Sequence, residues 1–220
     1  MGIADNLVLL KKSLPDTVSL IAVSKTKPFE AILEAYKANQ FDFGENYVQE
    51  LVSKAHLLPK DIRWHFIGHL QRNKVKEIIP FIYLIHGVDS ERLLNEINKE
   101  AQKINKRISV LLQVFIAKEE TKFGLDEIEL ENILNKKTEF PFVKICGLMG
   151  MASNSTEVGQ IKKEFNTLSS LFKKYQKQNP DFSALSMGMS SDYKLAIECG
   201  SNMIRIGSAI FGTRPPIKSI

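Results

Sequence analysis

The feature that most constrains this chain is a regular alternation of apolar segments typical of β-strands with amphipathic segments typical of helices. The strand-like segments are short and almost continuously apolar, as in parallel sheets that are covered on both faces. Eight are predicted, over residues 19–25, 41–44, 63–67, 81–86, 107–116, 142–149, 183–187 and 202–207. No change of composition marks a boundary between them. The pattern therefore predicts an α/β fold with a single domain, residues 1–220, which forms a (β/α)8 barrel rather than an open doubly wound sheet.

Several helix boundaries carry local signals. Asp126 and Glu129 have the spacing of a capping box, in which each side chain accepts a hydrogen bond from the backbone of the other residue. Asn154 and Glu157 resemble a looser version of the same motif. Gly200 is placed to end a helix predicted over residues 190–199, because glycine adopts the left-handed conformation of a helix C-terminus without strain.

Composition and charge narrow the classes of protein. The 220 residues carry a net charge of +5, but the lysines are scattered over helix patterns, which indicates solvated surfaces rather than a nucleic-acid interface. No apolar run is long enough for a signal peptide or a membrane span. Cys146 and Cys199 both lie in apolar segments, as free thiols do. We expect a cytoplasmic protein that binds neither nucleic acid nor membranes.

Lys25 ends the first predicted strand at a functional position. Side chains alternate along a strand, so Lys25 shares a face with Ile21 and Val23 and projects into the barrel mouth, where active sites of such barrels lie. A desolvated lysine loses its proton more readily and acts as a Schiff-base nucleophile. The alternative, for Lys25 alone, is a strand-end lysine that reaches water.

Two glycine-rich segments follow the last two predicted strands. SMGMSSDY, residues 186–193, and GSAIFG, residues 207–212, both combine glycines with hydroxyl residues at the start of a helical turn. Backbone N–H groups in such turns bind anions, and barrels often hold a phosphate between these two loops. Each segment alone is also compatible with a plain glycine turn. Together they predict a phosphate site.

Arg205 lies within the last predicted strand, between two isoleucines, so alternation turns it to the opposite face. A guanidinium inside a barrel needs an acceptor, which is either an acidic side chain or a ligand. His65 and His69, with His56 and His86 elsewhere, show no spacing typical of zinc, so we predict no metal site.

Six segments in order resemble the YggS/PROSC family of pyridoxal 5'-phosphate (PLP) homeostasis proteins. They are AVSKTKP (22–28), FGENYVQE (43–50), WHFIGHLQRNKVK (64–76), GLMGMA (147–152), LSMGMSSDY (185–193) and RIGSAIFG (205–212). The resemblance implies a barrel like the N-terminal domain of alanine racemase, with PLP bound to the lysine of AVSK. The residues implied to bind PLP are Lys25 through a Schiff base, Asn46 near the ring, Arg205 at the pyridine nitrogen, and Ser186, Gly207 and Ser208 at the phosphate.

Three functions then compete: a PLP carrier, a PLP-dependent amino-acid racemase, and a Schiff-base aldolase. Racemisation needs an acid or base on each face of the substrate carbon, and in alanine racemase-like enzymes a second domain supplies one of them. A permanently charged Arg205 at the ring nitrogen also weakens PLP as an electron sink. We therefore predict a non-catalytic, monomeric PLP-binding protein that buffers PLP or passes it to PLP-dependent apo-enzymes.

Overall fold

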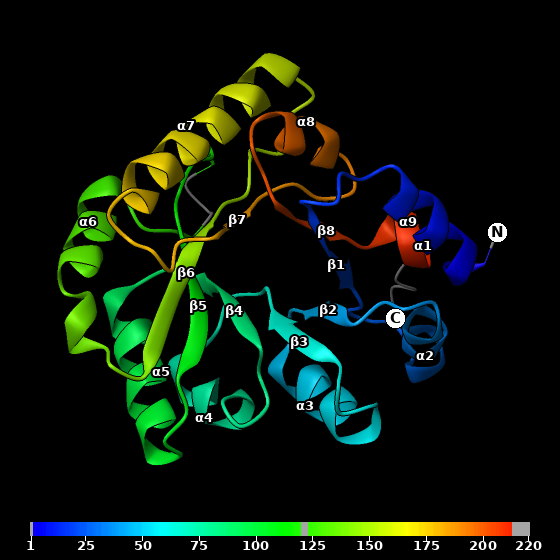
Figure 1. Cartoon of the computed structure of the whole chain (residues 1–220), viewed down its shortest axis with the longest axis horizontal. Coiled ribbons are helices and arrows are strands. Elements are labelled where there is room, and N and C mark those ends of the chain that lie inside the picture. The colour runs from blue at the N-terminus through cyan, green and yellow to red at the C-terminus, as the bar shows by residue number, and fades with distance from the viewer. Residues whose placement is uncertain (1, 120–122, 213–220) are drawn as a thin grey trace, which may run out of the picture.

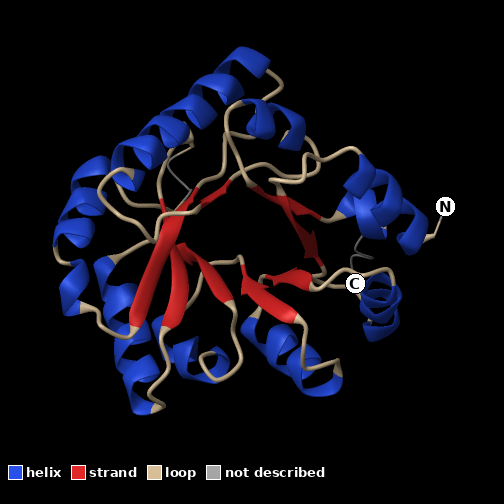
Figure 2. Ribbon diagram, viewed as in Figure 1, coloured by secondary structure: helices blue, strands red, loops and turns tan. Residues whose placement is uncertain are grey.

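Eight parallel strands close into one barrel in a computed structural model, which describes residues 2–119 and 123–212. Each strand pairs with its neighbours in sequence, and β1 pairs with β8 to complete the ring (Figure 2). The strands are β1 (Ser19–Val23), β2 (Asp42–Glu45), β3 (Arg63–Phe66), β4 (Leu84–Val88), β5 (Ile108–Gln113), β6 (Val143–Met149), β7 (Ala184–Ser186) and β8 (Met203–Ile206). The predicted (β/α)8 barrel is confirmed.

Helices surround the ring of strands (Figure 1). They are α1 (Ile3–Lys12), α2 (Phe29–Lys37), α3 (Val48–Leu57), α4 (Val75–Ile78), α5 (Glu91–Lys103), α6 (Glu127–Asn135), α7 (Val158–Gln176), α8 (Tyr193–Glu198) and α9 (Ser208–Phe211), with 3-10 turns η1 (Arg72–Lys74) and η2 (Lys137–Glu139). No helix among residues 2–119 and 123–212 has the length and apolar character needed to cross a membrane. The assignment of all 220 residues to one domain stays a prediction, because residues 1, 120–122 and 213–220 lie outside the described part.

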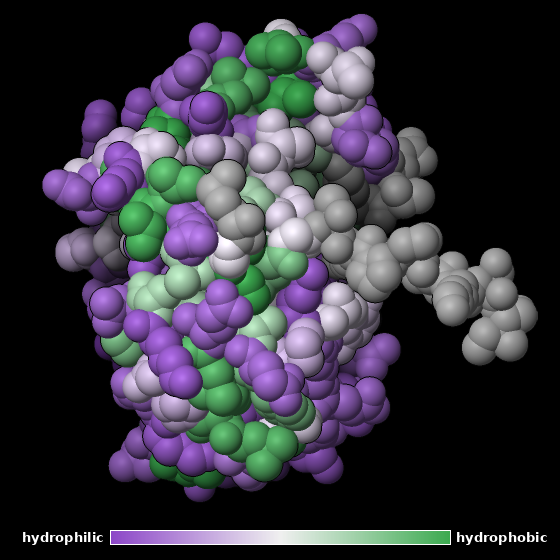
Figure 3. Space-filling model, turned by 90° about the vertical axis from the view of Figure 1, so that its right-hand side faces the viewer, coloured by the Kyte–Doolittle hydropathy of each residue, from purple (hydrophilic) through white to green (hydrophobic). Residues whose placement is uncertain are grey.

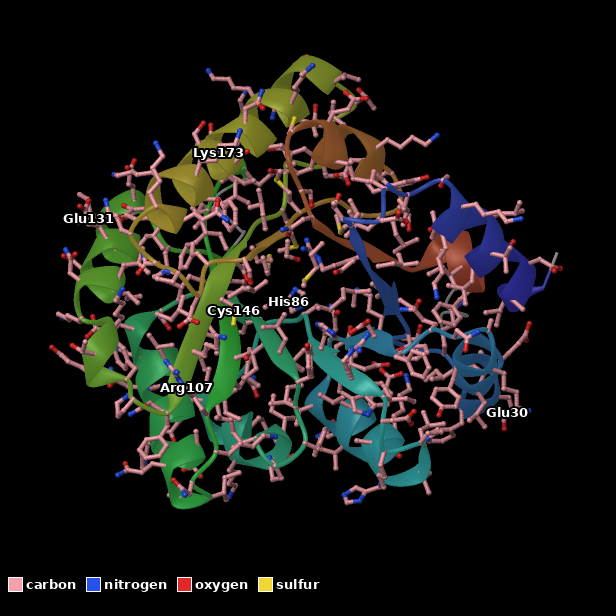
Figure 4. The ribbon with its side chains drawn as sticks, viewed as in Figure 1. Glu30, His86, Arg107, Glu131, Cys146 and Lys173 are labelled. Atoms are coloured by element: carbon pink, nitrogen blue, oxygen red, sulfur yellow. The ribbon has the colours of Figure 1, made fainter. Side chains whose placement is uncertain are left out.

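Two separate apolar cores hold the barrel together. The larger core lies between strands and helices; Phe165 and Leu168 of α7, for example, are fully buried in it. The smaller core fills part of the barrel interior, with Leu84, Leu111, Met149 and Ala184 as its buried members and Cys146 packed against them. Figure 4 labels Cys146 and His86 within the ring of strands. Side chains therefore fill the interior, and a site is left only at the ends of the strands.

The capping predictions had different outcomes. Asp126 and Glu129 form the predicted box, in which each side chain accepts a hydrogen bond from the other's backbone N–H, at 2.8 and 3.0 Å. The box predicted for Asn154 and Glu157 is wrong, because α7 begins at Val158 and its N-cap, Glu157, makes no side-chain cap. Ser155 Oγ instead accepts from the Glu157 N–H, at 3.1 Å.

The first and last parts of the chain meet at the β1–β8 seam. Leu20 and Ile204 are register partners across it, and the Asn6 side chain of α1 donates to the Ile210 carbonyl of α9, at 3.0 Å. Both described ends of the chain lie on this side of the barrel (Figure 1). Figure 3 views the same side, where hydrophobic residues are interspersed with hydrophilic ones. Both cysteines are free thiols, with Cys199 buried and Cys146 partly exposed.

Candidate cofactor pocket

A cavity of about 380 Å³ opens at the carboxyl ends of the strands, a volume in the range of small-ligand pockets. Its lining comes from the segments after β1, β2, β3, β6 and β7 and from β8 with the turn that follows it. The described lining residues are Val23, Lys25, Lys27, Asn46, Ile67, Met151, Met189, Ser190, Ser191, Arg205, Gly207, Ser208 and Gly212. Five of the six residues predicted to bind the cofactor are therefore brought together.

The backbone on both sides of Lys25 is held by hydrogen bonds. Lys54 Nζ, on α3, donates to the Ser24 carbonyl at 2.8 Å, and the Thr26 N–H donates to Glu50 Oε1 at 2.6 Å. Thr26 has φ of 63°, a left-handed conformation that a threonine rarely adopts unless its surroundings hold it there. Lys25 is partly buried between these anchors and lines the cavity. The main chain around it is thus fixed, so the position of its side chain is restricted.

Asn46 carries a polar atom that is buried without a partner. Its Oδ1 makes no hydrogen bond to any described residue. The backbone of Asn46 approaches Gly68 so closely that a Cβ at Gly68 would lie 2.4 Å from the Asn46 carbonyl oxygen. Only glycine allows this approach, and it sets the side chain of Asn46 at the cavity wall. Buried polar atoms in folded proteins are almost always paired, so a ligand atom is expected here.

Arg205 is 4% exposed and reaches the cavity from inside the barrel. Its NH1 donates to Ser186 Oγ at 2.6 Å and its NH2 to the Gly150 carbonyl at 3.2 Å. Burial lowers the pKa of Arg205 to about 10, against an opposing attraction from Asp192, so the group stays charged at neutral pH. A guanidinium has five N–H groups, and the described residues occupy two of them. The others are available to a ligand.

Ser186, the sixth predicted residue, does not line the cavity. It is fully buried at the end of β7, and its Oγ contacts Arg205 and His86 Nδ1, the latter at 3.0 Å. Its predicted contact with a phosphate stays untested. Ser186 therefore lies behind Arg205 as seen from the cavity.

Two turns face each other at the β7 and β8 side of the cavity. Ser190 Oγ accepts a hydrogen bond from the Gly207 N–H, at 3.3 Å. Gly188 starts the first turn with φ of 96°, and a Cβ there would lie 2.6 Å from Ala196 Cβ. The backbone N–H groups of Ser190, Ser191 and Ser208 make no hydrogen bond to another described residue. Clustered free N–H groups of this kind are typical of anion sites.

The charge of the cavity also favours an anion. Lys25, Lys27 and Arg205 line it, whereas no acidic side chain occurs among its described lining residues. Lys27 Nζ donates to the carbonyls of Phe211 and Gly212, at 3.0 and 3.2 Å, which joins the β1 side of the pocket to the end of α9. A larger hollow of about 830 Å³ lies between η1 and α5, but none of the predicted cofactor residues lines it.

Sequence reasoning did not single out Ser190 and Ser191, although both lie in the segment predicted to bind phosphate. It also missed Lys54, which has no periodic or motif signal to separate it from the surface lysines.

Of the histidines, His69 pairs with Asp89 at 2.9 Å, and His65 and His86 contact each other inside the barrel. No group of three or more His, Cys, Asp or Glu in the described ranges is arranged to hold a metal ion.

The comparisons with known proteins agree with this geometry. The sequence profile of the alanine racemase N-terminal domain matches residues 2–215. The pyridoxal phosphate homeostasis protein of Vibrio alginolyticus is 42% identical over 205 residues, which cover 91% of this chain and 88% of that protein.

Solved structures of similar proteins support the same family assignment. PipY of Synechococcus elongatus with PLP bound has a TM-score of 0.88 and 37% identity, and covers 96% of this chain and 100% of its own. Alanine racemase of E. faecalis has a TM-score of 0.78 at 16% identity, which covers 97% of this chain but 58% of the enzyme and shows a shared fold. The chain belongs to the pyridoxal phosphate homeostasis protein family, within the wider family of alanine racemase N-terminal domains.

Proposed function

We propose that this protein binds PLP in the cavity and holds it as a Schiff base on Lys25. The observation that carries the proposal is the meeting of Lys25, Arg205 and the Gly207–Ser208 turn in one cationic pocket at the strand ends. The unpartnered Asn46 Oδ1 and the free N–H groups of the two turns fit a ligand that offers both a polar ring and a phosphate. The relatives' shared name and the PLP-bound PipY structure support the same ligand.

Each residue has a separate task in this proposal. PLP supplies an aldehyde and an electron-poor ring. Lys25 would supply the amine that holds the aldehyde as a Schiff base. Arg205 would be the partner of the pyridine nitrogen, and Asn46 would contact the ring. Gly207 and Ser208, together with the turn at Ser190, hold the phosphate through backbone and hydroxyl donors.

The biological role we infer is PLP homeostasis: the protein buffers PLP and supplies it to PLP-dependent apo-enzymes. We place it in the cytoplasm as a monomer that binds neither nucleic acid nor membranes.

Substrate turnover is not part of the proposed function. The described lining residues include no tyrosine, histidine or acidic group that would serve as a second acid–base partner opposite Lys25. Lys27 Nζ is engaged with two carbonyls at the end of α9. A charged Arg205 beside the ring nitrogen opposes ring protonation and so disfavours carbanion chemistry. These features support a carrier over a racemase.

An absorbance spectrum combined with mass analysis tests the proposal. The purified protein mixed with PLP should show a Schiff-base band that disappears on borohydride reduction and leaves the cofactor's mass on the peptide that contains Lys25. Lys25→Ala should lose the band and keep cooperative unfolding. Lys27→Ala keeps the mass increment, since its neighbour is the attachment point. An increment that moves to Lys27 or elsewhere in the wild type overturns the assignment.

A paired assay tests the role. PLP-loaded protein should reactivate an apo-form of a PLP enzyme, while a chiral assay with alanine and serine should show no racemisation at an enzyme-like rate. Turnover on the order of 1 per second or faster would contradict the carrier. Lys25→Ala, run in both assays, separates cofactor held covalently from cofactor bound by the phosphate turns alone.

A further inference from the structure

Five side chains form a continuous line of hydrogen bonds through the barrel interior, from the N-terminal end of β2 to the cofactor pocket. We call this line the interior relay. Asp42 Oδ1 contacts His65 Nε2 at 3.0 Å, and His65 Nδ1 contacts His86 Nε2 at 2.9 Å. His86 Nδ1 lies 3.0 Å from Ser186 Oγ, which contacts Arg205 NH1 at 2.6 Å. The two histidines and Ser186 are at most 1% exposed, so water does not interrupt the line.

The two ends of the relay impose its direction. A guanidinium only donates hydrogen bonds, so Arg205 must donate to Ser186. An ionised carboxylate only accepts, and Asp42 is ionised: burial would raise its pKa, but hydrogen bonds from Arg63 and His65 outweigh burial and hold the pKa at about 2. His65 Nε2 must therefore carry the hydrogen that points at Asp42.

The middle of the relay follows from the ends. Burial lowers the pKa of His65 and lowers that of His86 further below its ordinary range, so both rings are neutral at pH 7. A neutral ring with hydrogen on Nε2 accepts through Nδ1. His65 Nδ1 then accepts from His86 Nε2, and His86 Nδ1 accepts from the Ser186 hydroxyl, whose hydrogen has no other acceptor among the described residues. Every bond points from Arg205 toward Asp42.

We propose that Asp42, His65, His86 and Ser186 are positioning residues that fix the guanidinium of Arg205 for the cofactor's ring nitrogen. The proposal rests on the proposed function, because that function places the ring at Arg205. The Asp42 charge polarises four successive hydrogen bonds, so Ser186 Oγ presents its lone pair to Arg205 NH1. With NH2 held by the Gly150 carbonyl, the orientation of the guanidinium plane is set before a ligand binds.

The surface end of the relay offers a precise way to disturb it. Asp42 also accepts from Arg63 Nε at 2.6 Å, through the oxygen that contacts His65, and from Arg63 NH2 through the other oxygen. In Asp42→Asn, Arg63 takes the single amide oxygen and the amide NH2 turns to His65. The relay can then reverse, with hydrogen on Nδ1 of both histidines. Arg63→Gln is the matched control, since it removes the surface ion pair and leaves the carboxylate in place.

Nitrogen-15 NMR of labelled histidine side chains in the cofactor-free protein reads the direction of the relay. His56→Gln and His69→Gln identify the signals of the other two of the four histidines. In the wild type and in Arg63→Gln, we expect His65 and His86 each to show one neutral form, protonated on Nε2. Asp42→Asn should show a second population protonated on Nδ1. A charged ring or an Nδ1–H form in the wild type, or unchanged tautomers in Asp42→Asn, overturns the relay.

The cofactor spectrum tests the consequence at the pocket. Asp42→Asn should release PLP about fivefold faster than Arg63→Gln and shift the absorbance maximum of the bound form, a coupling at the lower end of the usual range. Reversed tautomers with the spectrum and release rate of the control would overturn the link to Arg205. A wild type that takes up no PLP contradicts the proposed function instead, and the histidine spectra still decide the direction of the relay.

Discussion

Two buried cations in this molecule have opposite surroundings. Lys54, between α3 and the ends of β1 and β2, uses all three of its ammonium donors: on the Ser24 carbonyl, on Glu45 Oε1 at 2.7 Å and on Glu50 Oε1 at 2.6 Å. Arg205, inside the barrel, contacts only neutral groups among the described residues and retains donors that these residues leave unused. Both side chains are about 4% exposed, so burial alone does not distinguish them.

The difference separates a charge that stabilises the fold from a charge that is available to a ligand. The Lys54 ammonium is paired with carboxylates and connects the segments on both sides of Lys25, so it stabilises the fold. Arg205 is desolvated, and no carboxylate of residues 2–119 or 123–212 contacts it, an arrangement that costs free energy unless a ligand uses the remaining donors. A buried cation with unused donors therefore indicates a binding site, whereas a saturated one indicates a scaffold.

The largest expected effect is a loss of stability when Lys54, whose donors are all used, is replaced. Lys54→Met leaves the Glu45 carboxylate buried without its partner, and breaking a buried pair in this way typically costs about 3–5 kcal/mol. Urea unfolding of the cofactor-free protein measures it. Lys37→Met, at an exposed lysine of α2, should stay within about 0.5 kcal/mol of the wild type. A loss of similar size in both variants would remove the contrast between Lys54 and a surface lysine.

Arg205→Met should lower PLP affinity strongly and stability less. Its loss of stability should be smaller than that of Lys54→Met, because the partners of Arg205 in the described part of the chain are the neutral Ser186 hydroxyl and Gly150 carbonyl. PLP affinity should fall by about 10- to 150-fold, which corresponds to a hydrogen bond with a charged group of about 1.5–3 kcal/mol. Equilibrium dialysis and urea unfolding on the same preparations give both numbers. If Arg205→Met unfolds as easily as Lys54→Met while it retains PLP, Arg205 is a second scaffold cation.

Ser186→Ala and Ser208→Ala distinguish support of Arg205 from contact with the phosphate. Removal of the Ser208 hydroxyl should weaken the binding of PLP more than that of pyridoxal, which lacks the phosphate. Removal of the Ser186 hydroxyl should weaken the binding of both ligands by the same factor. Each change should cost roughly 1–3 kcal/mol of binding. Competition between the two ligands, measured by absorbance, is the readout. Selective loss of PLP in Ser186→Ala would return that serine to the phosphate site predicted from sequence.

The smallest expected effect is a pH dependence of stability. The pKa values of His65 and His86 lie below 6.5 in the folded protein, so the unfolded chain binds protons first as the pH falls. The free energy of unfolding is therefore retained above pH 6.5 and falls below it, by up to about 1.4 kcal/mol per pH unit for each histidine. Glu45, beside Lys54, has a pKa raised by burial and acts in the opposite direction. As the pH is lowered below 6.5, the urea midpoint of His86→Gln should decrease less steeply than that of the control His56→Gln.

The fold was predictable from sequence because each strand is covered on both faces and each helix on one, so periodicity reports them directly. Boundaries were less predictable. The fifth strand was predicted over residues 107–116 but ends at Gln113, because Val114 leaves the ladder to form an isolated bridge with Leu125. Residues 190–192 were predicted helical but form a turn in which Asp192 Oδ1 accepts from the Met189 N–H.

The sequence could predict which side chains point into the barrel, but not how far each lies from the cavity. Alternation turns Arg205 to the inner face and the resemblance implies Ser186 at the phosphate, yet neither shows which of the two reaches the cavity and which lies behind it. The relay depends on the lateral register of β2, β3, β4, β7 and β8, which no local pattern encodes. The contact between His65 and His86 became visible only once the strands were assembled.

The β1–β8 seam has a consequence for the order of events during synthesis. Lys25 follows β1 and Arg205 lies in β8, so the Lys25 side of the pocket is synthesised well before the Arg205 side. Ala22 can meet its register partner Ile206 only after β8 has been synthesised. A nascent chain therefore exposes Lys25 without the arginine and the turns that complete the pocket. Specific capture of the cofactor must follow closure of the ring, and any truncation before β8 yields a chain that retains the lysine but has no complete pocket around it.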